Sequence, residues 1–208
     1  MSEPLGADGG RHVARVGAQE IDLPLVALGP DLTIALLITV DHGLAFTRAA
    51  GEELASRLAP LEIELVATAA TMGIPVAMEV TKGLGLDDYL VLHKTPKIHL
   101  RDALTEPVRS ITTGPVQYLR LDRARLGEVA GKRVAFVDDV ISTGSSAAAA
   151  VRLLRQAGCE VIAVAALVTE TTAWRAELGE DADLVLALGE IPVFRPGADG
   201  ALAPDWTG

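Results

Sequence analysis

The stretch VAFVDDVISTGSS, from Val134 to Ser146, decides how this chain is interpreted. Four apolar residues lead into two adjacent aspartates, and a short loop of hydroxyl residues with one glycine follows. The apolar run predicts a buried strand, and the alanine-rich segment after the loop predicts a helix. Because Ser, Thr and Gly present backbone N–H groups and hydroxyl donors, the loop is suited to an anion. The two negative charges in front of it need a separate explanation.

Three explanations of Asp138 and Asp139 can be compared. The pair could end the strand and cap a turn, as acidic residues often do. It could bind a metal ion, but no third acid follows within the loop. It could instead accept hydrogen bonds from the vicinal hydroxyls of a sugar, while a phosphate on the same sugar reaches the loop. The third explanation uses every residue type in the stretch, and ribose 5-phosphate has the required shape.

The surrounding sequence alternates between strand-like and helical segments from Leu61 onward. This alternation indicates an α/β domain with a mainly parallel sheet flanked by helices. In such sheets ligands bind where strands end and helices begin, which is where the stretch places its loop. Strands are expected at 61–69, 89–94, 133–139, 159–168 and 183–188, and helices at 44–58, 73–85, 145–158 and 172–178.

The first 40 or so residues do not fit this alternation. Two strand-like runs occur there, at 21–28 and 32–40, and Pro24 in the first run indicates an edge strand because proline cannot donate to a ladder. We expect a small N-terminal, hood-like element at 1–43, a core domain at 44–194 and a C-terminal tail at 195–208.

The middle of the chain is expected to hold a mobile loop. Residues 95–107 are polar, mixed in charge and without clear period. A hairpin is then expected from the runs 108–113 and 116–121, which Gly114-Pro115 separates.

The composition argues against several classes of function. The formal net charge is −10, which disfavours nonspecific binding to nucleic acid or to an anionic membrane. The longest apolar-dominated run, 32–40, is far shorter than the roughly 20 residues of a membrane helix. The N-terminus lacks the pattern of a secretory signal, and the single cysteine, Cys159, fits a reducing compartment. We expect a cytoplasmic protein without a nucleic-acid or membrane partner.

The stretch VAFVDDVISTGSS resembles the phosphoribosyl-pyrophosphate signature of type I phosphoribosyltransferases, in which an apolar strand, two acids and a Thr/Gly/Ser loop follow one another. The similarity extends from about Leu61 to Leu178 and is greatest to adenine phosphoribosyltransferases and their bacterial relatives. It implies a homodimeric enzyme that transfers the 5-phosphoribosyl group from phosphoribosyl pyrophosphate to a purine base in nucleotide salvage, with Mg²⁺ as cofactor.

The resemblance also implies roles for particular residues. Asp138 and Asp139 would be the catalytic pair and would meet the ribose 2′- and 3′-hydroxyls. The loop would hold the 5′-phosphate, while the turn after the strand at 61–69 and a lysine after the strand at 89–94 would meet the diphosphate. The substrate-binding residues implied are Ala70, Thr71, Met72, Lys94, Ile141, Ser142, Thr143, Gly144, Ser145 and Ser146. Mg²⁺ would be held by pyrophosphate and ribose oxygens, with no direct ligand from the protein.

Two features depart from the family pattern. Relatives commonly place a basic residue before the glycine of the diphosphate turn, where this chain has Met72. Adenine enzymes carry a glutamate in the mobile loop, where the segment VRSITTG (108–114) has no acid and Glu106 lies just upstream. Three functions therefore stay open: a phosphoribosyltransferase with adenine as the favoured acceptor, one that uses guanine, hypoxanthine or xanthine, and a regulator that binds phosphoribosyl pyrophosphate without turnover.

Several residues support a structural interpretation as readily as a functional one. Lys97 and Arg101 are weaker candidates for the diphosphate, and both also fit solvated loop charges. The N-terminal element and the segment EIPVF are expected to border the base, where Phe194 could stack on the ring or pack in the core.

Overall fold

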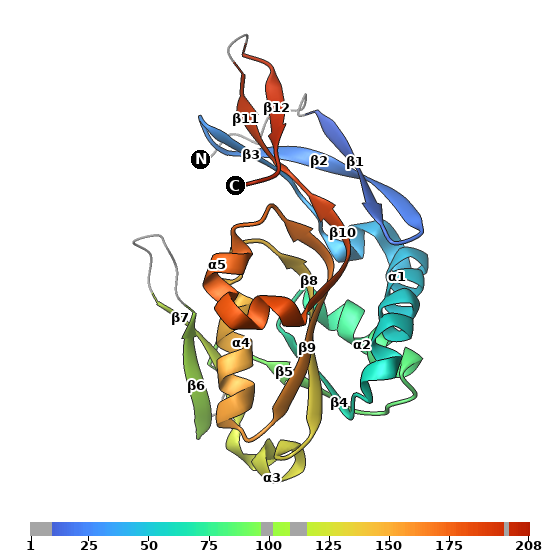
Figure 1. Cartoon of the computed structure of the whole chain (residues 1–208), viewed down its shortest axis with the longest axis vertical. Helices are drawn as coiled ribbons and strands as arrows, with labels where there is room; N and C mark the ends of the chain where they lie inside the picture. The colour runs from blue at the N-terminus through green and yellow to red at the C-terminus, as the bar shows by residue number, and fades with distance from the viewer. Residues whose placement is uncertain (1–9, 97–101, 109–115, 198–199) are drawn as a thin grey trace.

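The computed structural model describes residues 10–96, 102–108, 116–197 and 200–208 (Figure 1). The strands are β1 (Arg11–Val16), β2 (Gln19–Gly29), β3 (Leu32–Ala35), β4 (Leu65–Ala69), β5 (Tyr89–Leu92), β6 (Ala103–Val108), β7 (Gln117–Asp122), β8 (Arg133–Ile141), β9 (Glu160–Glu170), β10 (Val185–Ile191), β11 (Val193–Pro196) and β12 (Leu202–Asp205). The helices are α1 (Gly43–Leu58), α2 (Gly73–Gly83), α3 (Leu126–Val129), α4 (Ser145–Gln156) and α5 (Trp174–Leu178).

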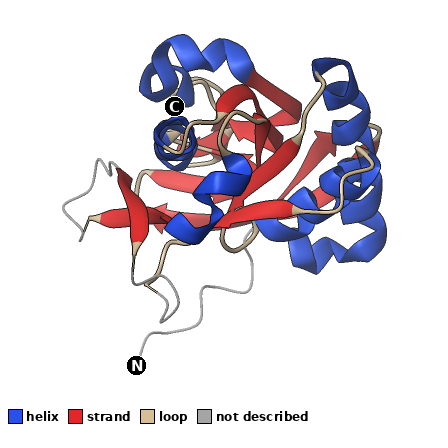
Figure 2. Cartoon of the chain, turned by 90° about the horizontal axis from the view of Figure 1, so that it is seen from below, coloured by secondary structure: helices blue, strands red, loops and turns tan. Residues whose placement is uncertain are grey.

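A parallel sheet in the order β10–β9–β8–β4–β5 forms the centre of the molecule. Helices lie on either side of it (Figure 2). Its strands read as continuous apolar runs because both faces are covered, as in β4, where every residue is buried. The predicted fold class, a mainly parallel sheet flanked by helices, is confirmed.

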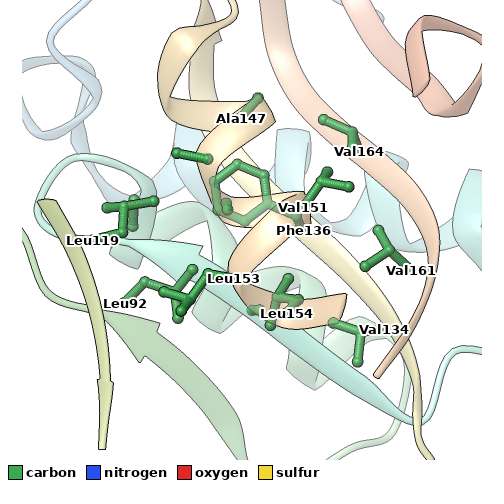
Figure 3. Close-up of a cluster of buried hydrophobic side chains, with 14 of the residues drawn as sticks. Leu92, Leu119, Val134, Phe136, Ala147, Val151, Leu153, Leu154, Val161 and Val164 are labelled. Atoms are coloured by element: carbon green, nitrogen blue, oxygen red, sulfur yellow. The ribbon is translucent and has the colours of Figure 1, made fainter. Parts of the chain in front are cut away.

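The two faces of the sheet have separate hydrophobic cores, because successive side chains of a strand point to opposite faces. On β8, Val134 and Phe136 pack with α4 and α5, whereas Ala135 and Val137 pack with α1 and α2. Figure 3 shows the first of these cores, with Phe136 beside Val151 of α4. The alanine-rich start of α4 is buried, so small side chains let this helix approach β8 closely.

A second sheet, which we call the hood sheet, consists of β1, β2, β3, β11 and β12 in that order. It lies at one end of the molecule in Figure 1 and joins strands from both ends of the chain. The run predicted as a strand at 32–40 is a strand only to Ala35, and a short helical turn follows at Thr39–His42.

The prediction that Pro24 marks an edge strand is wrong, because β2 pairs with β1 on one side and β3 on the other. The backbone N–H of Leu36 donates to the Pro24 carbonyl at 2.9 Å. Pro24 has no N–H group to donate to the Leu36 carbonyl in return. Because Leu36 lies just beyond the end of β3, this missing hydrogen bond falls outside the β2–β3 ladder.

The hairpin predicted in the middle of the chain exists, but its first strand was placed too late. β6 begins at Ala103 and pairs antiparallel with β7, so residues 103–107 are strand and not loop. The apolar positions of β7, Leu119 and Leu121, are fully buried and join the core under α4. The predicted strand at 61–69 begins only at Leu65, after a turn in which Glu62 has a φ of 51°.

Within the described ranges, no helix is long and apolar enough to cross a membrane. Cys159 is buried and has a free thiol, and its Sγ contacts the Val129 carbonyl oxygen at 3.4 Å. It is therefore a small core residue, as its position at the start of a buried strand suggests.

Candidate active site

A cavity of about 280 Å³ lies where β4 and β8 end, and Lys94, two residues beyond the end of β5, also lines it. It lies at the carboxyl edge of the parallel sheet, the place where α/β proteins bind ligands. The residues that line it are Ala69, Ala70, Thr71, Met72, Lys94, Asp138, Asp139, Val140, Ile141, Ser142, Thr143, Gly144, Ser146 and Ala147. The structure thus brings together all the residues predicted for the site except Ser145, which does not line the cavity.

Asp138 and Asp139 are adjacent residues near the carboxyl end of strand β8. Asp138 is buried and Asp139 is half-buried, and the Asp139 backbone N–H donates to Asp138 Oδ1 at 3.1 Å. Burial, and then the charge of Asp139, raise the pKa of Asp138 well above its ordinary value, and the charge of Lys94 opposes this. Burial also raises the pKa of Asp139. The cavity therefore contains two carboxyl groups that are poorly solvated and repel one another.

Gly73, the first residue of α2, allows the turn after β4 to approach β8. A Cβ atom at this position would overlap Asp138 Oδ1 and Thr68 Oγ1. A glycine here is therefore a packing requirement, and it lets the turn that carries Ala70, Thr71 and Met72 line the cavity beside the carboxylates. The Ala70–Thr71 peptide bond is cis.

The loop after β8 ends at the N-terminus of α4. Gly144 precedes this helix with a φ of 81° and, because glycine has no side chain, contributes no side-chain cap to the amides of the first turn. Thr143 Oγ1 and Ser145 Oγ are 3.1 Å apart, which turns the Ser145 hydroxyl to its neighbour in the loop. Ser146 and Ala147, in the first turn, line the cavity. A helix N-terminus with a Ser/Thr/Gly loop is a suitable site for a phosphate.

Two residues outside the predicted set support this loop. The Ser142 hydroxyl donates to Glu170 Oε2, from the end of β9. A Cβ atom on Gly144 would lie 3.0–3.1 Å from the backbone and side chain of Trp174. The sequence analysis missed Glu170 and Trp174, although the strand CEVIAVAALVTE carries a usable signal. An acid at the carboxyl end of a buried strand lies at the same edge as the acids of β8.

Lys94 reaches the cavity from the segment after β5. His93 and Arg120 exchange backbone hydrogen bonds of 3.0 Å, and Arg120 also donates from its guanidinium to the Lys94 carbonyl oxygen at 2.7 Å. The strand β7 therefore fixes the backbone of Lys94. Its ammonium group is the basic group among the lining residues, since Met72 occupies the other expected position.

Three other candidates lie away from the cavity. Glu106 pairs with Arg152 at 2.5 Å and accepts from Gln156 at 2.7 Å, so helix α4 holds its carboxylate. Phe194 is buried in the core beneath the hood sheet, in edge contact with His12. Lys97 and Arg101 lie outside the described residues, as does most of the segment VRSITTG.

The chain belongs to the family of phosphoribosyl transferase domains, whose model matches residues 41–187. This match covers more than two thirds of the chain and includes both loops that line the cavity. The family predicted from the stretch at Val134 to Ser146 is therefore confirmed.

Individual relatives differ in the base that their names state. A xanthine phosphoribosyltransferase of Chloroflexus aurantiacus is 34% identical over 138 residues, which are 64% of each chain. An orotate phosphoribosyltransferase of Bacillus caldolyticus is 56% identical over 39 residues, 19% of each chain. The chain thus spans less than two thirds of the length of these curated relatives. An adenine phosphoribosyltransferase structure from Trypanosoma brucei has a TM-score of 0.63 at 16% identity and covers 84% of this chain and 74% of its own, which is a likeness of fold.

Proposed function

We propose that this protein is a purine phosphoribosyltransferase. It transfers the 5-phosphoribosyl group from phosphoribosyl pyrophosphate to a purine base, with adenine favoured, and releases pyrophosphate in nucleotide salvage. The observation that carries the proposal is a single cavity in which two carboxylates, a hydroxyl-rich loop at a helix N-terminus and a lysine meet. Phosphoribosyl pyrophosphate presents the matching groups, namely a diol, a 5-phosphate and a diphosphate.

The sugar is assigned to the two carboxylates. Asp138 and Asp139 are deprived of water and repel one another, so each gains from a neutral hydrogen-bond donor. The 2′- and 3′-hydroxyls of ribose supply two such donors at adjacent carbons. Hydrogen bonds to charged groups contribute about 1.5–3 kcal/mol each, which makes the pair the main source of affinity for the ring.

The two phosphate-bearing ends of the substrate are assigned to opposite walls of the cavity. The 5-phosphate is held by the loop from Ile141 to Ser146 and by the amides that begin α4. The diphosphate lies along the backbone of Ala70, Thr71 and Met72, with Lys94 as the cation.

The reaction breaks the bond between C1 of ribose and the pyrophosphate oxygen, and the electron pair leaves with pyrophosphate. Positive charge develops on the ring, and a purine nitrogen forms the new bond to C1. Catalysis is then mainly positioning and electrostatic stabilisation. The carboxylates at the ring edge hold the sugar and favour its positive charge, while Lys94 stabilises the departing anion.

Mg²⁺ is part of the proposal as a cofactor that the substrate brings. Within the described part of the chain, no group of three or more His, Cys, Asp or Glu side chains is placed to hold a metal ion. Mg²⁺ in phosphate sites is commonly bound through substrate oxygens with few protein ligands, and the oxygen-rich cavity fits that arrangement. When bound, the ion neutralises charge on the leaving diphosphate.

The hood sheet is the proposed border of the base pocket. The xanthine relative supports a second candidate, in which a 6-oxopurine replaces adenine as acceptor. A third candidate is a regulator that binds phosphoribosyl pyrophosphate without turnover. It is favoured by Met72 on the diphosphate wall and by Glu106, whose carboxylate is engaged with Arg152 and Gln156 and is not free to take a proton from the base.

The proposed partners are small molecules and a second copy of the chain. A homodimer acting in the cytoplasm is the assembly expected from the family resemblance, and the free thiol of Cys159 agrees with a reducing compartment. Light scattering of the purified protein at several concentrations tests the dimer, and a mass of one chain at all of them would contradict it.

The decisive experiment incubates the protein with phosphoribosyl pyrophosphate, Mg²⁺ and one base at a time: adenine, guanine, hypoxanthine, xanthine or orotate. Pyrophosphate release and nucleotide formation are both measured. We expect nucleotide from a purine and none from orotate. Formation of orotidine monophosphate alone would overturn the purine assignment. Binding of phosphoribosyl pyrophosphate without product from any base would instead support the regulator.

A further inference from the structure

Glu170 and Ser142 are brought together by the register of the central sheet. Ile141 of β8 pairs with Thr169 of β9 in parallel register. The next residues along the chain are Ser142, just beyond the end of β8, and Glu170, the last residue of β9, and the Ser142 hydroxyl donates to Glu170 Oε2. The contact thus follows from strand pairing and ties the loop after β8 to a second, separate strand.

The surroundings of Glu170 offer little else for a carboxylate. The residue is 8% exposed, and on its other side it pairs with the buried Ile191 of β10. Burial raises the pKa of Glu170, and the hydrogen bond from Ser142 opposes this. Glu170 does not line the cavity, so it reaches a ligand only through Ser142. A buried acid in this position costs stability, which points to a role in the site.

The same segment supports the other end of the loop. Trp174 is buried and its indole N–H donates to the Thr171 carbonyl oxygen at 3.1 Å, which fixes the ring. Gly144 packs against this residue so closely that a Cβ atom would lie 3.0 Å from the Trp174 carbonyl oxygen. The segment from Glu170 to Trp174 therefore contacts the loop at two positions, Ser142 and Gly144.

We propose that Glu170 is a positioning residue that sets the shape of the phosphate loop through Ser142. The proposal rests on the proposed function, because it takes the loop to be the site of the 5-phosphate. A serine hydroxyl has one proton to donate. That proton is committed to Glu170, so Ser142 contributes its backbone amide to the phosphate while its side chain fixes the direction of that amide.

The test measures binding of ribose 5-phosphate by calorimetry to the full chain and to three variants. Glu170→Ala and Ser142→Ala are each expected to weaken binding about tenfold, since each removes the same hydrogen bond. The double variant is expected to bind no more weakly than either single variant, because the two residues act as one unit. Glu170→Gln is expected to stay within about threefold of the wild type, because its amide oxygen still accepts from Ser142.

Pyrophosphate serves as a second probe, because it lacks a sugar 5-phosphate and is assigned to the opposite wall. All these variants are expected to bind it as the wild type does. Glu160→Ala removes an acid from the first residue of β9, at the far end of the same strand. This control is expected to change neither binding constant. In steady-state kinetics, Ser142→Ala and Glu170→Ala are expected to raise KM for phosphoribosyl pyrophosphate and to leave KM for the base unchanged.

The outcomes separate this inference from the function on which it rests. Wild-type binding of ribose 5-phosphate, with Ser142→Ala and Glu170→Ala unchanged, would overturn the inference alone. A parallel loss of pyrophosphate binding would also overturn it, because the effect would then be general damage. If the wild type does not bind ribose 5-phosphate, the phosphoribosyl site is wrong and the inference is overturned with it. Should Glu170→Ala fail to fold, Ser142→Ala and Glu170→Gln decide the matter.

Discussion

The loop after β8 and the turn after β4 line one cavity, yet they are built differently. The first, from Ser142 to Ser146, follows two acids, starts a helix and is held by Glu170 and Trp174. The second, from Ala70 to Met72, contributes small or apolar side chains to the wall, and the charge comes from Lys94, two residues after β5.

Under the proposed function, the two ends of the substrate are recognised by different means. The end of β8 and the loop after it offer side-chain acceptors and a helix N-terminus, and these groups all come from one short stretch of sequence. The turn after β4 offers mainly backbone groups, and Gly73 lets that backbone lie close to Asp138. Binding energy is therefore expected to be concentrated on the β8 side.

The largest effect is expected from Asp138→Asn combined with Asp139→Asn. The change removes both charged acceptors, and affinity for phosphoribosyl pyrophosphate should fall by about 100-fold or more at roughly 1.5–3 kcal/mol per hydrogen bond. Calorimetry measures the loss, and circular dichroism checks that the fold persists. Pyrophosphate alone should still bind. A double variant that binds phosphoribosyl pyrophosphate normally would show that the carboxylates do not hold the diol.

Gly144→Ala should give the next largest effect. The residue has a φ of 81°, which costs a side chain roughly 1–2 kcal/mol, and its Cβ would also press on Trp174. We expect about tenfold weaker binding of ribose 5-phosphate together with a lower Tm.

The matched control is Gly131→Ala, at the other end of β8. Gly131 has a φ of 78°, but a Cβ atom there would meet open space. It should lower the Tm and leave ligand affinity unchanged. Equal loss of affinity in both variants would mean that general destabilisation, and not the contact between Gly144 and Trp174, weakens binding.

Tighter pyrophosphate binding is expected from a substitution in the turn after β4. Met72→Arg places a cation beside the turn after β4, where a charge contact is missing, and should tighten pyrophosphate binding about threefold at low salt. The gain should shrink as ionic strength rises. Met78→Arg, a change of the same kind at a position that is 45% exposed on α2 and outside the cavity lining, serves as the control. Unchanged affinity in Met72→Arg would place the diphosphate elsewhere.

The smallest effect concerns stability and pH. The pKa of Asp138 is raised in the folded protein, so its stabilising contribution is complete below the ordinary carboxyl pKa and is lost as pH rises through the raised value. Asp138→Asn keeps an acceptor for the Asp139 amide and should raise the Tm by a few degrees at pH 7, at about 2–4 °C per kcal/mol for a chain of this size. The gain should disappear near pH 3 in thermal scans.

Asp205 provides a control of opposite sign. Hydrogen bonds from Arg195, Thr207 and Gly208 hold the pKa of Asp205 below its ordinary value. Its contribution is present above the ordinary carboxyl pKa and is lost as pH falls. Asp205→Asn should therefore lower the Tm at pH 7. If both variants shift the Tm in the same direction, the stabilisation of Asp138→Asn does not come from removing a buried charge.

The sequence predicted the loop after β8 well because its parts are neighbours in the chain. Apolar residues, acids, a glycine and a helix start all lie between Val134 and Gln156, and local rules suffice to order them. The same rules identified the sheet, whose strands are continuous apolar runs. Met72 and Lys94 came from the family resemblance, since nothing local distinguishes them from ordinary loop residues.

The missed features depend on contacts between distant segments. Glu170 became a candidate only when strand register placed it beside Ser142. The error at Pro24 has a similar origin. A proline fits in this inner strand because the neighbouring strand β3 ends at Ala35, one residue short of the position where Pro24 lacks an N–H donor. The segment expected as a C-terminal tail, 195–208, contains β12 (Leu202–Asp205), which pairs with β11, and β11 pairs with β3. Such pairing is tertiary and outweighs local propensity.

The hood sheet has a consequence for how the chain is made. Thr33 of β3 pairs with Phe194 of β11, about 160 residues later, so this sheet is completed only once nearly the whole chain has left the ribosome. Contacts of such long sequence separation form late and slowly. In the central sheet, strands β4, β5, β8 and β9 pair with one another, and all four are synthesised before β11. A nascent chain halted before β11 is thus expected to have a folded loop after β8 while the hood sheet is still incomplete.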